Sequence, residues 1–204
     1  MSHQVRRVVM AVVAGTLVVG VAWAQRDDAE KLATQPTPSP APPTKVSPEQ
    51  AAQAKGDPDH ATASILDRSG RRVGLATLTA TPNGTLINAE FTGLPAGVHA
   101  FHVHAVGKCE PPFDSAGPHF NPTHAAHGIA IGPGHAGDLP NLFVPQDGRV
   151  HVELLAPGLN IRDGADSVFD ADGAALVVHQ NADDYKTDPA GAAGERIACG
   201  VIER

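Results

Sequence analysis

The stretch VGLATLTATPNGTLINAEFT, residues 73–92, carries the pattern that decides the fold. Apolar residues alternate with polar or small ones along Val73–Ala80 and again along Thr85–Thr92, which is typical of β-strands with one buried face. Thr81-Pro82-Asn83-Gly84 separates the two runs, and Asn-Gly between alternating runs is a strong hairpin signal. The stretch therefore predicts two antiparallel strands joined by a tight turn.

The same pattern continues on both sides of this hairpin. Further short runs predict strands over His60–Asp67, Val98–Ala105, Asn141–Val144, Arg149–Leu155, Ala174–His179 and Ile197–Ile202. Eight short strands without a convincing helix favour an all-β antiparallel sandwich or barrel, and so does a composition of 21 Gly, 18 Pro and 4% aromatic residues. Two loops, Val106–Pro140 and Gln180–Arg196, are long enough to predict a functional role.

The N-terminal residues predict export. A pair of arginines, the apolar run Val8–Val21 and the small residues around Trp23 make residues 1–24 a secretory signal peptide or, if they are retained, an anchor that tethers the protein to a membrane through residues 8–24. The proline-rich residues 25–58 are expected to be a disordered linker, which either holds the domain away from a surface or has no role. The folded domain is expected over 59–204, in the periplasm, the cell envelope or the exterior.

Charge and cysteine usage exclude several classes of protein. The net charge of −7 argues against nucleic acid as a partner, although a local cationic site can still attract an anionic substrate. Cys109 and Cys199 form no CxxC motif, which excludes a zinc ribbon and a thioredoxin-like site. The two cysteines are either free buried thiols or a disulfide, and a disulfide that closes so long a loop would stabilise the fold by about 4–5 kcal/mol. Export favours the disulfide.

Potential metal ligands gather in and around the long loops. After His102-Val103-His104 come His119, His127, His135, Asp138 and His179. These residues offer more ligands than one metal ion can use, and imidazole suits copper and zinc, so the chain is expected to bind two metals. Strand alternation places His102 and His104 on one face and His99 on the other, so His99 is interpreted as a core or hydrogen-bonding residue.

Six motifs, in the family's order, resemble those of the copper/zinc superoxide dismutases. They are GVHAFHVH (97–104), GPHFNP (117–122), HG (127–128), HAGDLPNL (135–142), LVVH (176–179) and GERIACGVI (194–202). The resemblance implies an eight-stranded Greek-key barrel or sandwich. It also implies an enzyme that converts superoxide to dioxygen and hydrogen peroxide with copper and zinc.

The resemblance implies a role for each candidate residue. The family's copper ligands fall on His102, His104, His119 and His179, and its zinc ligands on His119, His127, His135 and Asp138. His119 would bridge both metals and relay a proton, and Arg196 would dock superoxide beside copper. Asp183 would orient one ligand of each metal, and Cys109 and Cys199 would form the family's disulfide.

Several alternatives stay open. His124 is an additional histidine that could compete for zinc, although His127 fits better because a glycine follows it. Lys108 and Lys186 either help to steer the anion or are simply solvated. A homodimer is neither required nor excluded. The main alternative function is an exported copper or zinc buffer or chaperone on the same fold.

Overall fold

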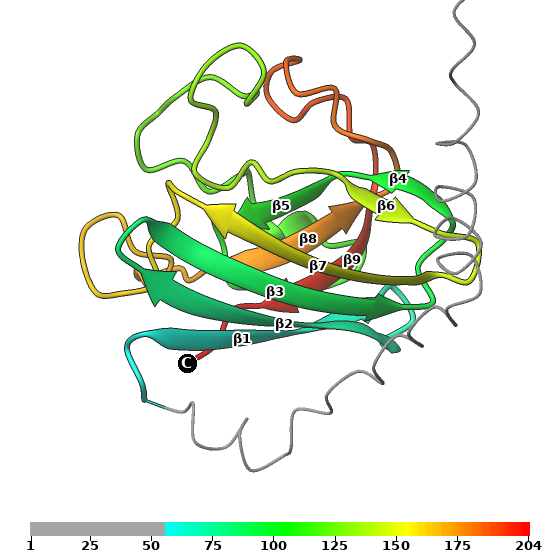
Figure 1. Ribbon diagram of the computed structural model, residues 1–204, viewed down its shortest axis with the longest axis horizontal. Coiled ribbons are helices and arrows are strands. Elements are labelled where there is room, and N and C mark those ends of the chain that lie inside the picture. The colour runs from blue at the N-terminus through cyan, green and yellow to red at the C-terminus, as the bar shows by residue number, and fades with distance from the viewer. Residues whose placement is uncertain (1–55) are drawn as a thin grey trace, which may run out of the picture. The chain divides into compact units, whose positions relative to one another are not determined.

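The computed structural model describes residues 56–204, which form a strongly curled antiparallel sheet with long loops at one end (Figure 1). The predicted signal peptide, the predicted membrane tether and nearly all of the predicted linker lie outside the described residues. Within the described part, no helix is long and apolar enough to cross a membrane.

The strands are β1 (His60–Asp67), β2 (Arg72–Thr81), β3 (Gly84–Thr92), β4 (Gly97–His99), β5 (Phe101–His104), β6 (Leu142–Val144), β7 (Arg149–Ala156), β8 (Ala175–His179) and β9 (Arg196–Val201), with one 3-10 turn, η1 (Asp114–Ala116). The first five strands follow one another closely, and longer loops precede β6, β8 and β9. A seven-stranded sheet has the order β5-β8-β9-β1-β2-β3-β7, and β4 pairs with β6 in a second sheet. All named pairings are antiparallel, which confirms the predicted fold class.

One predicted strand, Val98–Ala105, is two strands in the structure. The interruption is Ala100, whose N–H donates to the Asn181 carbonyl and whose carbonyl accepts the His179 N–H. Before this residue the chain pairs with β6, and after it the chain pairs with β8. The interruption therefore transfers one continuous segment from the small sheet to the large one, and the predicted count of eight strands holds if β4 and β5 are counted together.

The predicted hairpin forms, but its turn lies one residue earlier than Asn-Gly suggests. Thr81 pairs with Gly84, so Pro82 and Asn83 are the two turn residues and Gly84 begins β3. Gly84 has a φ of +120°, and a Cβ there would lie 2.4 Å from the Ala156 carbonyl oxygen of β7. A glycine is needed at this position because the neighbouring strand β7 lies so close to the turn.

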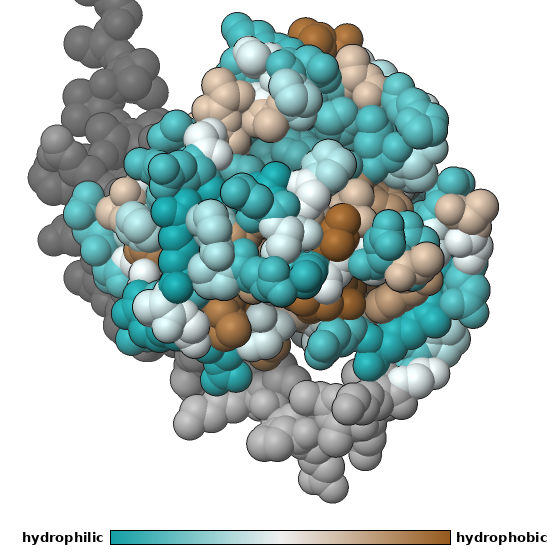
Figure 2. All heavy atoms as spheres, turned by 180° about the vertical axis from the view of Figure 1, so that it is seen from behind, coloured by the Kyte–Doolittle hydropathy of each residue, from teal (hydrophilic) through white to brown (hydrophobic). Residues whose placement is uncertain are grey.

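Strand β8 is covered by apolar side chains on both of its faces, and its five residues are all buried. Leu176 and Val178 belong to the main core, together with side chains such as Ile65, Leu78 and Phe101. On the other face, Ala175 and Val177 pack against Phe113 and Cys199. The face opposite to that in Figure 1 is mostly hydrophilic, with small hydrophobic patches (Figure 2).

The predicted disulfide between Cys109 and Cys199 is present, with a Cα–Cα distance of 5.6 Å. It joins the first long loop to β9 across 90 positions of sequence. The loop around Phe113 is therefore held against the outer face of β8 by a covalent bond as well as by apolar packing.

Replacing both cysteines by serine should lower the free energy of unfolding by about 4–5 kcal/mol, because the unfolded chain regains the entropy of a long closed loop. Urea denaturation of the metal-free double variant and of the oxidised wild type measures this difference. The chemically reduced wild type is the control, and it should match the variant. A difference below about 1 kcal/mol would show that the cross-link contributes little here.

Candidate metal centre

Two groups of four buried side chains converge at the loop end of the sheet. The first ligand group is His102, His104, His119 and His179, and the second ligand group is His119, His127, His135 and Asp138. Within each group the potential ligand atoms all lie within 4.8 Å of one another. All seven residues predicted as ligands are thus brought together, and His119 belongs to both groups.

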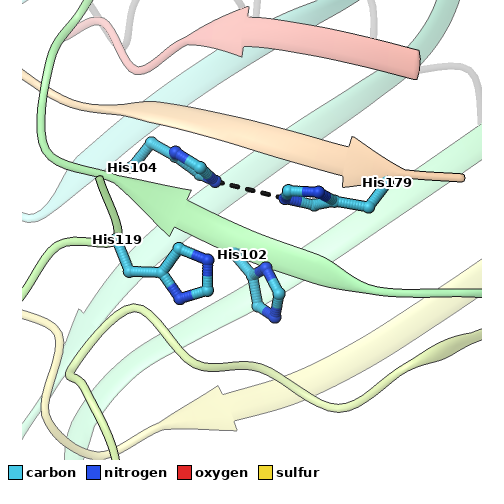
Figure 3. Close-up of side chains that lie close together, drawn as sticks. All are labelled: His102, His104, His119 and His179. Atoms are coloured by element: carbon cyan, nitrogen blue, oxygen red, sulfur yellow. Dashed lines mark hydrogen bonds between the residues drawn. The ribbon is translucent and has the colours of Figure 1, made fainter. Parts of the chain in front are cut away.

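Strand geometry positions the first ligand group. Phe101 and Val103 of β5 pack into the main core, whereas His102 and His104, in alternate positions, join the ligand group. His179 ends β8, and the Nε2 atoms of His104 and His179 are 3.3 Å apart. Figure 3 shows these two rings pointing toward one another, with His102 and His119 beside them.

Loop backbone bonded to the open edge of β5 brings in the remaining ligands. The Val103 N–H donates to the Gly137 carbonyl, and the Val103 carbonyl accepts the Phe120 N–H. These bonds set His119 beside His104 and Asp138 beside His102. A Cβ on Gly137 would lie 2.2 Å from the Val103 carbonyl oxygen, so no other residue allows this approach.

In the first ligand group, oxygen atoms face the ring nitrogens that point away from the centre. His102 Nε2 lies 2.8 Å from Asp183 Oδ2, His104 Nδ1 lies 2.8 Å from the Gly117 carbonyl oxygen, and His179 Nδ1 lies 3.3 Å from that of Gly194. A neutral imidazole that donates its one N–H there keeps a lone pair on its other nitrogen. Among the described residues, His102 Nδ1 and His119 Nε2 are buried without a hydrogen-bond partner, so a metal ion fits this group.

In the second ligand group, three Nδ1 atoms surround one carboxylate. Asp138 Oδ1 lies 2.9 Å from His119 Nδ1 and 3.1 Å from His135 Nδ1, and Oδ2 lies 3.0 Å from His127 Nδ1. The backbone N–H groups of Gly128 and His135 donate to Oδ2 and fix the carboxylate. Three imidazoles and one carboxylate are a suitable donor set for tetrahedral zinc.

Asp183, to which the family resemblance assigns the orientation of one ligand of each metal, contacts a histidine of each ligand group. Its Oδ2 is 2.8 Å from His102 Nε2, and its Oδ1 is 3.0 Å from His127 Nε2. The Tyr185 N–H also donates to Oδ1. A Cβ on Gly191 would lie 1.8 Å from Oδ1, so this glycine leaves the space that the carboxylate occupies.

Two further residues that hold Asp183 were missed from the sequence. The Asn141 side chain accepts the Asp183 N–H and donates to the Asp183 carbonyl. The Tyr185 hydroxyl in turn accepts the Asn141 N–H at 2.7 Å. The sequence offered only weak signals: Asn141 lies in the motif that contains Asp138, and Tyr185 is the only tyrosine of the chain.

Burial and hydrogen bonding set the protonation of the metal-free centre. Burial lowers the pKa of His102 to about 4 and that of His179 to about 3. Burial alone would raise the pKa of Asp183, but hydrogen bonds from His102 and His127 bring it down to about 2. At neutral pH His102 and His179 are therefore neutral and Asp183 is ionised, which are the states in which these side chains bind or orient metals.

Arg196, the first residue of β9, lies beside the first ligand group. A register shift between Val178 and His179 pairs His179 with Arg196 across the two strands. The Arg196 guanidinium donates to the carbonyls of Phe113 and Gly117, both at 2.7 Å. Burial lowers the pKa of Arg196 and the Asp114 carboxylate opposes this shift, but a guanidinium remains charged at neutral pH.

The other histidines of residues 56–204 belong to neither ligand group. His99 is buried, with Nδ1 2.9 Å from the His179 carbonyl oxygen and Nε2 3.0 Å from that of Pro95, which confirms its interpretation as a hydrogen-bonding residue. His124 belongs to neither group but lines a cavity of about 630 Å³ next to His119 and His135.

The two lysines considered for steering are both exposed. Lys108 pairs with Glu110 at 3.0 Å, so its charge is partly compensated by a neighbouring carboxylate. The Lys186 N–H donates to Asp184 in a turn of the second long loop. Neither contact links a lysine to the ligand groups.

Comparisons with known proteins agree with this geometry. Residues 72–202 match the family model described as copper/zinc superoxide dismutase. Superoxide dismutase [Cu-Zn] 1 of Aquifex aeolicus is 46% identical over 145 residues, which are 69% of this chain and 86% of that protein. Superoxide dismutase [Cu-Zn] of Caulobacter vibrioides is 42% identical over 149 residues, 70% of this chain and 85% of that protein.

Solved structures give the same result. The crystal structure of a superoxide dismutase-like protein from Bacillus subtilis has a TM-score of 0.65 and 38% sequence identity, and the match covers 69% of this chain and 96% of that one. Both the sequence match and the fold extend over the two ligand groups. The chain therefore belongs to the copper/zinc superoxide dismutase family, whose members are oxidoreductases that use both metals.

Proposed function

We propose that this chain converts superoxide to dioxygen and hydrogen peroxide, with copper in the first ligand group and zinc in the second. The observation that carries the proposal is the sharing of His119, which offers Nε2 to the first group and Nδ1 to the second. The all-histidine group suits copper, and the group that contains the Asp138 carboxylate suits zinc.

His119 is the residue that we assign to proton transfer. Copper held by the first ligand group would supply the one-electron chemistry of the Cu(II)/Cu(I) couple, and zinc would be held by the second ligand group, of which His119 is also a member. The net reaction consumes two superoxide anions and two protons and yields one dioxygen and one hydrogen peroxide. His119 Nε2 is buried and has no hydrogen-bond partner in the described structure, so whenever copper is not bound to this nitrogen it can hold a proton and donate it to the peroxide as it forms.

Arg196 is the residue that we assign to anion docking. Two carbonyls fix its guanidinium beside the first ligand group, and these bonds use only part of its five N–H donors. The other donors and the permanent charge suit a small anion. A local cation of this kind also explains how a chain with a net charge of −7 can attract superoxide.

We also propose that the protein is exported to the periplasm, the cell envelope or the exterior. The pattern of residues 1–24 supports export, and so does the Cys109–Cys199 disulfide, because structural disulfides persist in oxidising compartments. Sequencing the N-terminus of the mature protein distinguishes a cleaved signal from a retained membrane tether.

Metal analysis and a superoxide dismutation assay on the full chain test the proposed activity together. We expect one copper and one zinc per chain and rapid dismutation, and a His124→Ala variant should keep both because His124 lies outside the two ligand groups. Removing copper with a chelator should abolish activity, and returning it should restore activity. Two bound metals without dismutation would favour the buffer or chaperone instead.

An Arg196→Ala variant should dismutate superoxide about ten- to a hundredfold more slowly at low salt, because the fixed cation beside the first ligand group is lost. Its rate should also depend less on ionic strength than the wild-type rate does. Rates measured over a range of salt concentrations, together with the copper and zinc content, separate docking from metal loss. An unchanged rate in a fully loaded variant would exclude the docking role.

An Asp183→Asn variant should bind both metals about 10–100-fold more weakly, because one carboxylate orients His102 and His127 together. An amide has one acceptor oxygen and would turn a donor toward one of the two rings. Competition with a chelator of known affinity measures the change for each metal. Asp184→Asn is the matched control, since the Asp184 side chain contacts only its own turn; equal effects in both variants would contradict the bridging role.

A further inference from the structure

The backbone of Arg196 is held by a residue that is distant in sequence. Arg68 lies in the turn between β1 and β2, and its Nε donates to the Arg196 carbonyl at 2.8 Å. The pairing of Asp67 with Ala198 brings this turn alongside the start of β9. Arg196 is therefore fixed from both ends: Phe113 and Gly117 hold its side chain, and Arg68 holds its main chain.

The same arginine also binds the carboxylate closest in sequence to the docking cation. Arg68 Nη1 lies 2.8 Å from Glu195 Oε2, and Glu195 directly precedes Arg196. The Glu195 side chain is 66% exposed and that of Arg68 is 39% exposed, so this pair contributes little to the stability of the fold. However, the positive charge of Arg68 neutralises the negative charge of Glu195. Without Arg68, the Glu195 carboxylate would weaken the positive potential around Arg196.

We propose that Arg68 is a positioning residue for Arg196: it fixes the Arg196 main chain and neutralises Glu195, and so preserves the local field that attracts the anionic substrate. The inference rests on the proposed function, because it assumes that Arg196 docks superoxide. Two carboxylates influence Arg196: Asp114 through its charge and Glu195 as its neighbour in the chain. Of these two, Glu195 is the one that forms an ion pair with an arginine within the described residues.

Four variants of the full chain, loaded with both metals, test this role. Arg68→Gln removes the contacts to both Glu195 and Arg196, Glu195→Gln removes the carboxylate, and the double variant removes both charges. The matched control is Arg71→Gln, in the same turn. Arg71 pairs with Asp67 at 3.0 Å and, in the described structure, forms no hydrogen bond or ion pair with β9, so its loss changes the net charge equally without touching the docking residue.

At about 10 mM ionic strength, kcat/KM of Arg68→Gln should be about two- to threefold lower than that of Arg71→Gln. This difference between the two variants should vanish at about 0.5 M salt. The double variant should recover most of this loss, because the uncompensated charge of Glu195 is gone. Copper and zinc content should be the same in all four variants. A purely structural role for Arg68 would not produce rescue by Glu195→Gln.

The affinity of the copper-loaded protein for azide provides a second readout that needs no turnover. Azide is a small anion, and its binding to copper changes the visible absorption of the metal. Arg68→Gln should weaken azide binding about two- to threefold relative to Arg71→Gln at low salt. A wild type that binds azide but does not dismutate superoxide would refute the proposed function, while the ratio between the variants would still test Arg68.

Three results would overturn the role of Arg68. Equal losses in Arg68→Gln and Arg71→Gln would mean that only net charge matters. A double variant as slow as Arg68→Gln would show that Glu195 is not the charge being neutralised. Loss of copper from Arg68→Gln alone would mean that the residue stabilises the metal centre rather than the docking cation.

Discussion

The rest of the metal centre depends on one constraint: seven polar ligand residues are buried in one place, and buried polar atoms need partners. In the structure, the ring nitrogens that face away from the centre lie against oxygen acceptors. The lone pairs of the opposite ring nitrogens then point toward the centre. Asp183 serves two rings in this way, and backbone carbonyls serve His104 and His179. His119 is different because it belongs to both ligand groups: its Nδ1 faces Asp138, and its Nε2 is buried without a hydrogen-bond partner, so both of its nitrogens are left to the centre.

Much of this could be predicted from the sequence because strand geometry is local. Alternation alone separates His102 and His104 from His99, and the six short motifs contain every residue that the structure brings into the two ligand groups. The same local rules failed at Ala100, where the strand changes its partner. No pattern within the segment Val98–Ala105 shows that the strand pairs with β6 on one side of this residue and with β8 on the other.

What could not be predicted depends on backbone atoms and on long-range contacts. The carbonyls of Gly117 and Gly194 orient two histidines, yet a carbonyl has no signature in a sequence. The register shift at Val178 and His179 that sets Arg196 opposite His179 is likewise invisible before the strands are paired. Arg68 in its turn resembles an ordinary exposed residue, and only the fold brings it to Arg196.

One backbone oxygen contacts both the proposed docking cation and a member of the first ligand group. The Gly117 carbonyl accepts hydrogen bonds from both His104 Nδ1 and Arg196 Nη2. The proposed docking cation and a member of the first ligand group are therefore positioned by the same oxygen atom. That atom belongs to the loop cross-linked by Cys109 to Cys199, three residues after Arg196 on the same strand. The covalent bond therefore joins the strand that carries the guanidinium to the loop whose carbonyls orient it. A shift of this loop would move the histidine ring and the cation together, which preserves the distance between them that an anion bound to both would require.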